Sequence, residues 1–268
     1  MAHRHFEGKK HSSAYLKYRV SPPMEVTEEI LGFLEKKKGI PFDLAVDVGC
    51  GSGQGTVLLA PHFTQVVGTD ISPAQLEVAL ANCKAPNISY RLCPAEELPF
   101  SDGGVHLVTS MNAAHWFDRP QFLQGGRQGV EAQWVSGTGQ LCCRQHSQDL
   151  SDICQKFFKT LLPFRSAHLG LSSTAPLYRK MYNSCPYPDK EWHECDVRRP
   201  MPLCDYIGMV ETLSSYQVLS KEEPVKAHSF SLEFQKRLFS VMGVSSPEIE
   251  VIVVIKYLYW LASKPAAT

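Results

Sequence analysis

The chain has 268 residues, 44% of them hydrophobic, and its 27 basic residues balance its 27 acidic ones. This length suits one globular domain with insertions, and the zero formal net charge argues against a nucleic-acid-binding protein. No apolar run reaches the roughly 18 residues that a membrane span needs, so we expect no membrane association.

The cysteine pattern indicates a reducing environment. The nine cysteines include no C-x-x-C pair, and the chain starts with polar residues rather than a secretory signal. We therefore expect free thiols and a cytoplasmic location. His3, His5 and His11 lack cysteine or carboxylate partners at ligand spacing, so no metal site is expected. The oligomeric state stays open.

The first segments predict a tail followed by two helices. Residues 1–12 are expected to form a flexible tail, and residues 13–268 a single domain. A short amphipathic segment over residues 13–19 carries Tyr18 on one side. Apolar residues at helical spacing predict a longer helix over residues 24–38.

The most informative stretch is a glycine turn between two apolar runs in residues 44–60. This order predicts a strand, a turn and a helix. The turn reads Asp-x-Gly-x-Gly-x-Gly, from Asp47 through Gly49 and Gly51 to Gly53. Glycines permit positive φ and leave the backbone bare, so a ligand can lie against the turn at the amino end of the helix.

A second predicted strand, over residues 65–70, ends in Asp70. A carboxylate at this position can accept hydrogen bonds from both hydroxyls of a ribose. The dinucleotide signature G-x-G-x-x-G does not fit, because its third glycine would fall on Gln54 or Thr56. A nicotinamide cofactor is therefore set aside in favour of another nucleoside ligand.

Strands and helices continue to alternate after Asp70. Ser72 and Pro73 have the residue types of a helix start, and that helix is expected to reach about residue 81. Residues 88–92 and 105–110 predict a third and a fourth strand. Such alternation is typical of a parallel sheet with crossover helices, which binds its ligand at the carboxyl ends of the strands.

The second half of the chain gives fewer signals. Residues 151–225 show no clear strand rhythm, and we expect a helical cap inserted there, with helices over 153–162 and 203–213. Residues 250–261 form the most apolar segment and predict a buried strand, the last and antiparallel one of the sheet.

Five blocks of the sequence together resemble the class I S-adenosylmethionine-dependent methyltransferases. Within this class the chain is similar to the type-11 family and its trans-aconitate-type small-molecule enzymes. The blocks are residues 15–19, 49–53, 67–72, 95–100 and 112–118. The resemblance implies a Rossmann-like α/β fold with a mostly parallel seven-stranded sheet, helices on both faces and a helical cap. It also implies S-adenosylmethionine as the cofactor and a small-molecule methyl acceptor.

The resemblance also implies which residues bind. The cofactor-binding residues would be Asp47, Gly49, Gly51, Gly53, Asp70, Ile71, Ala95, Glu96 and Asn112. Those on the acceptor side would be Tyr18, Arg19, His115 and Trp116, with Ala113 in the wall between. His115 is the candidate catalytic residue, as a base for a hydroxyl or amine acceptor. A carboxylate acceptor needs no base, and Arg19 or His115 would then orient the anion.

Each assignment has a simpler alternative that the sequence leaves open. Asp47 could only cap its strand, Glu96 could be merely solvated, and His115 and Trp116 could pack in the core.

Residues 124–148 depart from the family pattern. Three glycines near the start of this segment oppose the usual helix. The strand candidate over 140–146 has three apolar residues, whereas a central parallel strand is nearly all apolar. We hypothesise an altered reading frame or an unusual exon, which a comparison of the three coding frames would test.

Two functions therefore remain in view. The first is a methyltransferase acting on a small molecule, with a carboxylate as one candidate acceptor. The alternative is a protein that binds S-adenosylmethionine but is catalytically impaired by segment 124–148. A nucleic-acid methyltransferase is disfavoured by the balanced charge. It is also disfavoured because residues 112–115 do not form an Asn/Asp-Pro-Pro-aromatic tetrad.

Overall fold

The computed structural model describes residues 9–21, 23–101, 103–118, 120–122, 130–136, 140–142, 147–166 and 174–263. The strands are β1 (Leu44–Val48), β2 (Gln65–Asp70), β3 (Ile88–Leu92), β4 (Leu107–Met111), β5 (Val130–Ser136), β6 (Gln140–Cys142), β7 (Asp189–Pro202) and β8 (Glu250–Ser263). The helices are α1 (Lys9–Tyr18), α2 (Met24–Lys38), α3 (Gln54–Leu59), α4 (Pro73–Asn82), α6 (Ser147–Leu161), α7 (Thr174–Ser184), α8 (Leu203–Glu211), α9 (Ser214–Glu222) and α10 (Pro224–Met242).

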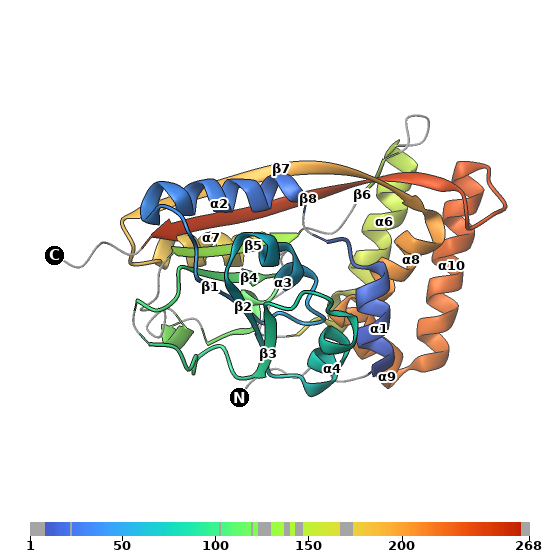
Figure 1. Cartoon of the computed structure of the whole chain (residues 1–268). Helices are drawn as coiled ribbons and strands as arrows, with labels where there is room; N and C mark the ends of the chain where they lie inside the picture. Colours follow the sequence, from blue (N-terminus) through green and yellow to red (C-terminus); the bar gives the residue numbers. More distant parts are fainter. Residues whose placement is uncertain are drawn as a thin grey trace.

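The strands of the described residues form one sheet in the order β3-β2-β1-β4-β5-β8-β6, with β7 paired to β8 (Figure 1). β1 to β5 are joined by parallel pairings, as the alternation of strands and helices predicts. β8 is antiparallel to β5, β6 and β7. The Rossmann-like arrangement is confirmed, and β1 places its carboxyl end between those of β2 and β4.

The expected number of seven strands is wrong, because the described sheet has eight. β8 is long enough, at 14 residues, to pair with β5 through its second half and with β6 through residues 252–254. β7 pairs with β8 along its whole length. The expectation of helices without strands over 151–225 therefore fails at β7.

The two faces of the sheet are covered by different helices. Along β1, Ala45 belongs to a buried cluster with Ile30 and Leu34 of α2. Val46, which points to the opposite face, packs in a cluster with Tyr178 of α7. The alternation along a strand buried on both faces explains why β1 reads as a continuous apolar run apart from its acid.

A helical cap stands at one end of the sheet, formed by α6, α8, α9 and α10 with α1 beside them (Figure 1). Its core is aromatic: the Phe157 ring stacks on Phe230 with centroids 4.6 Å apart and lies 4.2 Å from Phe234. The first half of β8 adds Val251 and Val253 to the same cluster. The helix predicted over 153–162 lies almost wholly within α6, and the helix predicted over 203–213 contains α8.

Two predictions about boundaries need correction. Helix α1 begins at Lys9, inside the predicted tail, and Ser12 is buried. The fifth parallel strand is Val130–Ser136, not residues 140–146; of these, Gln140–Cys142 form the short β6. Residues 123–129 and 143–146 lie outside the described residues, so the prediction that segment 124–148 lacks the family's usual helix is not tested.

No helix in the described ranges combines the length and apolarity needed to cross a membrane.

Candidate functional site

The glycine turn joins β1 to α3 through three residues with left-handed backbone. Gly49, Gly51 and Gly53 have φ angles of 68°, 55° and 83°, which side chains with a Cβ rarely adopt. A Cβ on Gly49 would lie 2.5 Å from the Cβ of Ala113, so the turn packs closely against the segment after β4. A Cβ on Gly51 would meet only the Gln75 Oε1, at 3.9 Å. The turn is therefore open at Gly51, where a ligand can approach the backbone.

Asp70 at the end of β2 is bonded to this turn. Its Oδ2 accepts a hydrogen bond from the Gly51 N–H at 2.9 Å, and its Oδ1 accepts one from the Ser72 N–H at 2.8 Å. Burial raises the pKa of the carboxyl, and these backbone donors oppose that shift. Each carboxylate oxygen has a second lone pair, so the group can still accept from a ribose hydroxyl. Asp70 thus shapes the turn and presents an acceptor beside it.

Asp47 is 1% exposed and makes internal hydrogen bonds. Thr56 of α3 donates to its Oδ2 at 2.7 Å, and Thr109 of β4 donates to its Oδ1 at 2.9 Å. Burial raises the pKa of Asp47 to about 6. The carboxylate links β1, α3 and β4 below the glycine turn, which agrees with the simpler alternative of a residue that braces the strand end.

The segment after β4 turns sharply into a short 3-10 helix, Ala114–Trp116. Asn112 has a φ of 57°, an uncommon value for a non-glycine residue. His115 is buried, and its Nδ1 lies 3.0 Å from the hydroxyl of Tyr178 on α7. The His115 ring also lies 5.1 Å from that of the half-buried Trp116. Sequence reasoning missed Tyr178, since nothing near it along the chain marks it.

Helix α1 is held against the glycine turn by Gln54, the first residue of α3. The Gln54 Nε2 donates to the carbonyl oxygens of Leu16 and Arg19, at 3.1 and 3.0 Å. The Arg19 Nε donates to the Thr212 Oγ1 at 2.9 Å, and its guanidinium lies 5.1 Å from the centre of the Tyr15 ring. In the sequence, Gln54 stood out only as the residue that breaks the dinucleotide signature.

The remaining predicted residues lie at nearby loops. Ile71 follows Asp70 directly and is half-buried, whereas Ala95 is buried in the cluster that contains Val46. The Glu96 Oε1 accepts a hydrogen bond from the backbone N–H of Asp118 at 2.7 Å, which ties the loop after β3 to that after β4. Glu96 is therefore engaged with the protein rather than merely solvated.

Tyr18 packs against the helical cap. Its ring packs on Gly208 of α8, where a Cβ would lie 2.7 Å from the ring carbons. The structure thus brings the glycines, Asp70 and the segment around Ala113 together at one end of the sheet, and places Tyr18 in the helical cap. Among the residues whose placement is described, no three histidine, cysteine or acidic side chains form a group that could hold a metal ion.

Residues 46–127 match the family described as "Methyltransferase domain". A Dictyostelium discoideum protein described as a methyltransferase is 39% identical over 113 residues, covering 42% of this chain and 40% of that protein. A Saccharomyces cerevisiae protein described as an S-adenosylmethionine-dependent methyltransferase is 31% identical over 118 residues, with 42% and 39% covered. The chain thus spans about two fifths of the length of these two relatives.

Two further proteins resemble the chain, one in a short stretch of sequence and the other in its fold. A trans-aconitate 2-methyltransferase of Methylobacterium radiotolerans is 44% identical over 54 residues, covering 19% of this chain and 20% of that protein. A solved structure from Anaeromyxobacter dehalogenans, described as a type II methyltransferase, has a TM-score of 0.72 at 20% identity. The alignment covers 92% of this chain and 98% of that one, so the fold is shared well beyond the glycine turn.

The open backbone at Gly51 and the adjacent Asp70 carboxylate suit a nucleoside with free ribose hydroxyls. S-adenosylmethionine, on which the Saccharomyces cerevisiae relative is described as depending, is a nucleoside of this kind. Residues 46–127 are therefore similar to the methyltransferase-domain family, and the chain shares its fold with the Anaeromyxobacter dehalogenans structure.

Proposed function

We propose that this protein is a methyltransferase that transfers the methyl group of S-adenosylmethionine to a carboxylate of a small molecule. The observation that carries the proposal is the bond between Gly51 and Asp70. This hydrogen bond holds the half-buried Gly51 backbone and a ribose acceptor at the same end of the sheet as His115. The short match to a trans-aconitate 2-methyltransferase supports a carboxylate acceptor, because trans-aconitate is a carboxylic acid.

When bound, the cofactor supplies a methyl group already activated by its positively charged sulfur. The protein therefore has to align the acceptor and exclude water. In this proposal Asp70 accepts hydrogen bonds from the ribose, and Gly51 leaves space for the cofactor beside the backbone. Helix α1, held by Gln54, covers the turn and keeps water out.

Four side chains are proposed to hold the acceptor. They form a row of neighbouring groups that runs from the end of α1 to the segment after β4. The Arg19 guanidinium lies over the Tyr15 ring. Tyr15 is close enough to Tyr178 to contribute to its raised pKa, although burial is the main cause. Tyr178 in turn contacts the His115 imidazole. A cation and an imidazole at the two ends of this row suit an anionic acceptor.

The contact between Tyr178 and His115 supports orientation of an anion rather than removal of a proton. The backbone of His115 donates a hydrogen bond that lowers the pKa of Tyr178. If the phenol oxygen accepts from that backbone N–H, its own O–H is available to donate to the His115 Nδ1. The ring proton is then on Nε2, and His115 acts as a hydrogen-bond donor. Because a carboxylate is already a nucleophile at neutral pH, this arrangement needs no general base.

The test is a methylation assay on matched acceptors. The full chain is incubated with S-adenosylmethionine and a panel of di- and tricarboxylic acids, each paired with its amide and its alcohol analogue. Mass spectrometry follows S-adenosylhomocysteine and the methylated product. Mild alkali then distinguishes a methyl ester, which is hydrolysed, from a methyl ether or amine. We expect esters from at least one carboxylate and no product from its amide.

Other results would reject parts of the proposal separately. Methylation of the alcohols or amides alone would exclude the carboxylate as acceptor and leave the methyltransferase activity. Cofactor binding without turnover on any acceptor would favour the catalytically impaired binding protein. The pairing of β5 with both β4 and β8 removes the main argument for that alternative, since segment 130–136 occupies the place of the fifth strand.

A further inference from the structure

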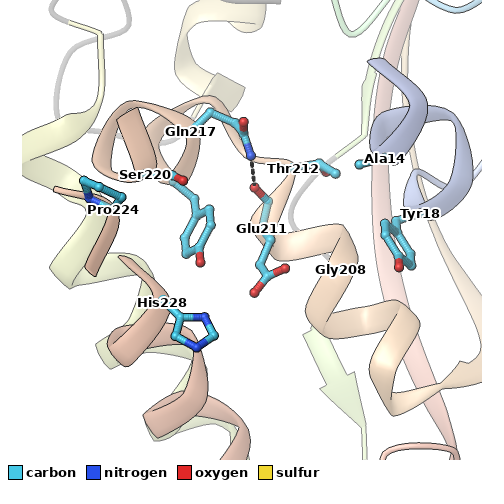
Figure 2. Close-up of a pocket in the computed structure, with 10 residues that line it drawn as sticks. Ala14, Tyr18, Gly208, Glu211, Thr212, Gln217, Ser220, Pro224 and His228 are labelled. Carbon is cyan, nitrogen blue, oxygen red and sulfur yellow. Dashed lines mark hydrogen bonds between the residues drawn. The ribbon is translucent and has the colours of Figure 1, made fainter. Parts of the chain in front are cut away.

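The helical cap contains a cavity of about 330 Å³ between α1, α8, α9 and α10. None of the glycines of the turn lines it, and neither does Asp70 or His115. In Figure 2 the Glu211 side chain extends from α8 into the space between Tyr18 on α1 and His228 on α10. The cavity is therefore separate from the cofactor site, and a carboxylate lies in its wall.

The polar groups of the wall mainly offer acceptors to a ligand. Thr212, Tyr216 and Gln217 each donate a hydrogen bond to a main-chain carbonyl oxygen, at 2.6, 3.1 and 2.8 Å. The hydroxyl protons of Thr212 and Tyr216 are therefore used within the protein, as is one of the two amide protons of Gln217. The Glu211 carboxylate and the amide oxygen of Gln217 remain as acceptors, so the lining suits a ligand that donates hydrogen bonds.

The charges around the cavity also favour a cationic ligand. The hydroxyl of Ser231 donates to the Glu211 carboxylate, and within the described ranges no lysine or arginine forms an ion pair with Glu211. The two nearby cations already have partners: the Lys17 ammonium lies 4.7 Å from the centre of the Tyr18 ring, and the Arg19 Nε donates to Thr212. His228 is exposed and is the titratable base among the lining residues.

We propose that this cavity binds a small organic amine in its ammonium form. The ammonium group donates hydrogen bonds to the Glu211 carboxylate, and the hydrocarbon part lies against the rings of Tyr18 and Tyr216. The volume is near the lower end of ligand pockets, which limits the ligand to a small molecule. The inference does not depend on the proposed function, because it uses neither the cofactor nor the acceptor site.

The experiment uses the full chain saturated with S-adenosylhomocysteine, so that the cofactor site is filled. Calorimetric titration compares phenethylammonium chloride with 2-phenylethanol, which replaces the ammonium by a hydroxyl, and with 3-phenylpropionate, which carries the opposite charge. We expect the ammonium compound to bind at least about tenfold more tightly than the alcohol, the scale of one charge-assisted hydrogen bond. The carboxylate compound should not bind.

Substitutions inside and outside the cavity test whether the ammonium compound binds there. Glu211→Gln should weaken binding of the ammonium compound at least about tenfold. Glu222→Gln should leave it unchanged, because it removes the same charge from an exposed position on α9. Ser220→Leu, which fills the cavity but keeps the carboxylate, should also prevent binding. Thermal melts establish that each variant is folded. Equal binding of the alcohol, no binding by the wild type, or full binding by a folded Glu211→Gln or Ser220→Leu variant would overturn the proposal.

Discussion

The Asp70 carboxylate is shared between the protein and the cofactor that we expect it to bind. Both oxygens already accept backbone hydrogen bonds, from Gly51 and Ser72. This double use explains why an acid is needed here: an uncharged acceptor would hold the turn less firmly and the ribose less tightly. Its position at the end of the second strand was readable from the sequence, but its bond to Gly51 was not.

Replacement of Asp70 should weaken cofactor binding. We expect Asp70→Ala to cost at least about 1.5 kcal/mol in the binding of S-adenosylmethionine, because hydrogen bonds to a charged group are lost. Asp70→Asn keeps one acceptor oxygen and should lose less. Calorimetry measures both, with Asp43→Ala as the control, since Asp43 is exposed before β1. Unchanged affinity in the Ala variant would remove Asp70 from the site.

Tyr178 should determine the tautomer of His115. In the wild type we expect the Nε2–H form, held by the hydroxyl 3.0 Å from Nδ1. Tyr178→Phe keeps the ring but removes this partner, so the two tautomers should mix. The 15N chemical shifts of the imidazole report the change directly. The control is Tyr182→Phe, one turn further along α7, where the hydroxyl contacts the Lys190 carbonyl. Identical His115 shifts in wild type and Tyr178→Phe would contradict this role.

At the scale of elements, the side chain of Gln54 at the start of α3 links α1 to the cofactor turn. Gln54 donates to the carbonyl of Leu16, in the last turn of α1 where carbonyls lack a partner inside the helix, and to that of Arg19 just after the helix. A residue that belongs to the cofactor turn therefore also fixes the helix that covers it.

Gln54→Ala should loosen α1 without unfolding the sheet. Two neutral hydrogen bonds of about 1 kcal/mol each are lost, so local opening of α1 becomes more frequent. Hydrogen exchange should become at least about tenfold faster over Lys9–Tyr18, while β1 and β2 keep their protection. Gln65→Ala, at the exposed start of β2, is the matched control. If α1 exchanges at the wild-type rate, Gln54 does not hold it.

β7 shows why one strand escaped sequence reasoning. Its outward positions carry charged residues such as Glu194 and Arg198, whereas inward residues such as Val197 are only partly buried against the core of the cap. Charge on an exposed edge strand discourages pairing with other chains, but it also hides the alternation that identifies strands. β5 has a similarly weak pattern, because Glu131 and Gln133 interrupt the continuous apolar run that is typical of a central strand.

At the scale of the whole molecule, buried Asp47 makes the free energy of unfolding depend on pH. Burial raises its pKa from an ordinary value of 3.8 to about 6 in the folded state. The folded protein then holds this proton more tightly than the unfolded chain. The stabilising contribution of Asp47 is therefore full below pH 3.8 and is lost as the pH rises through about 6.

Urea unfolding of the wild type and of the Asp47→Asn variant at several pH values tests this dependence. The stability of the wild type minus that of Asp47→Asn should fall by about 3 kcal/mol as the pH rises from 3.8 through 6. Asp43→Asn, at an exposed position nearby, is the control for the loss of one carboxylate. A constant difference between wild type and Asp47→Asn over this range would show that Asp47 does not titrate as described.

The sequence by itself determined the parts of this protein that depend on near neighbours in the chain. Periodicity predicted α2, β1, β2 and β3, and the spacing of Gly49, Gly51 and Gly53 before Asp70 predicted the nucleoside site. Helix and strand formation and positive φ are local properties, so a single sequence records them.

Only the tertiary structure decided which distant groups meet. Tyr178 is 63 residues from His115, and Thr109 is 62 residues from Asp47, yet each pair is hydrogen-bonded. The cavity at Glu211 likewise exists only because α1 packs against helices from the far end of the chain. Such contacts arise when buried faces pack together, and packing is selected by the shape of the whole fold rather than by spacing along the chain.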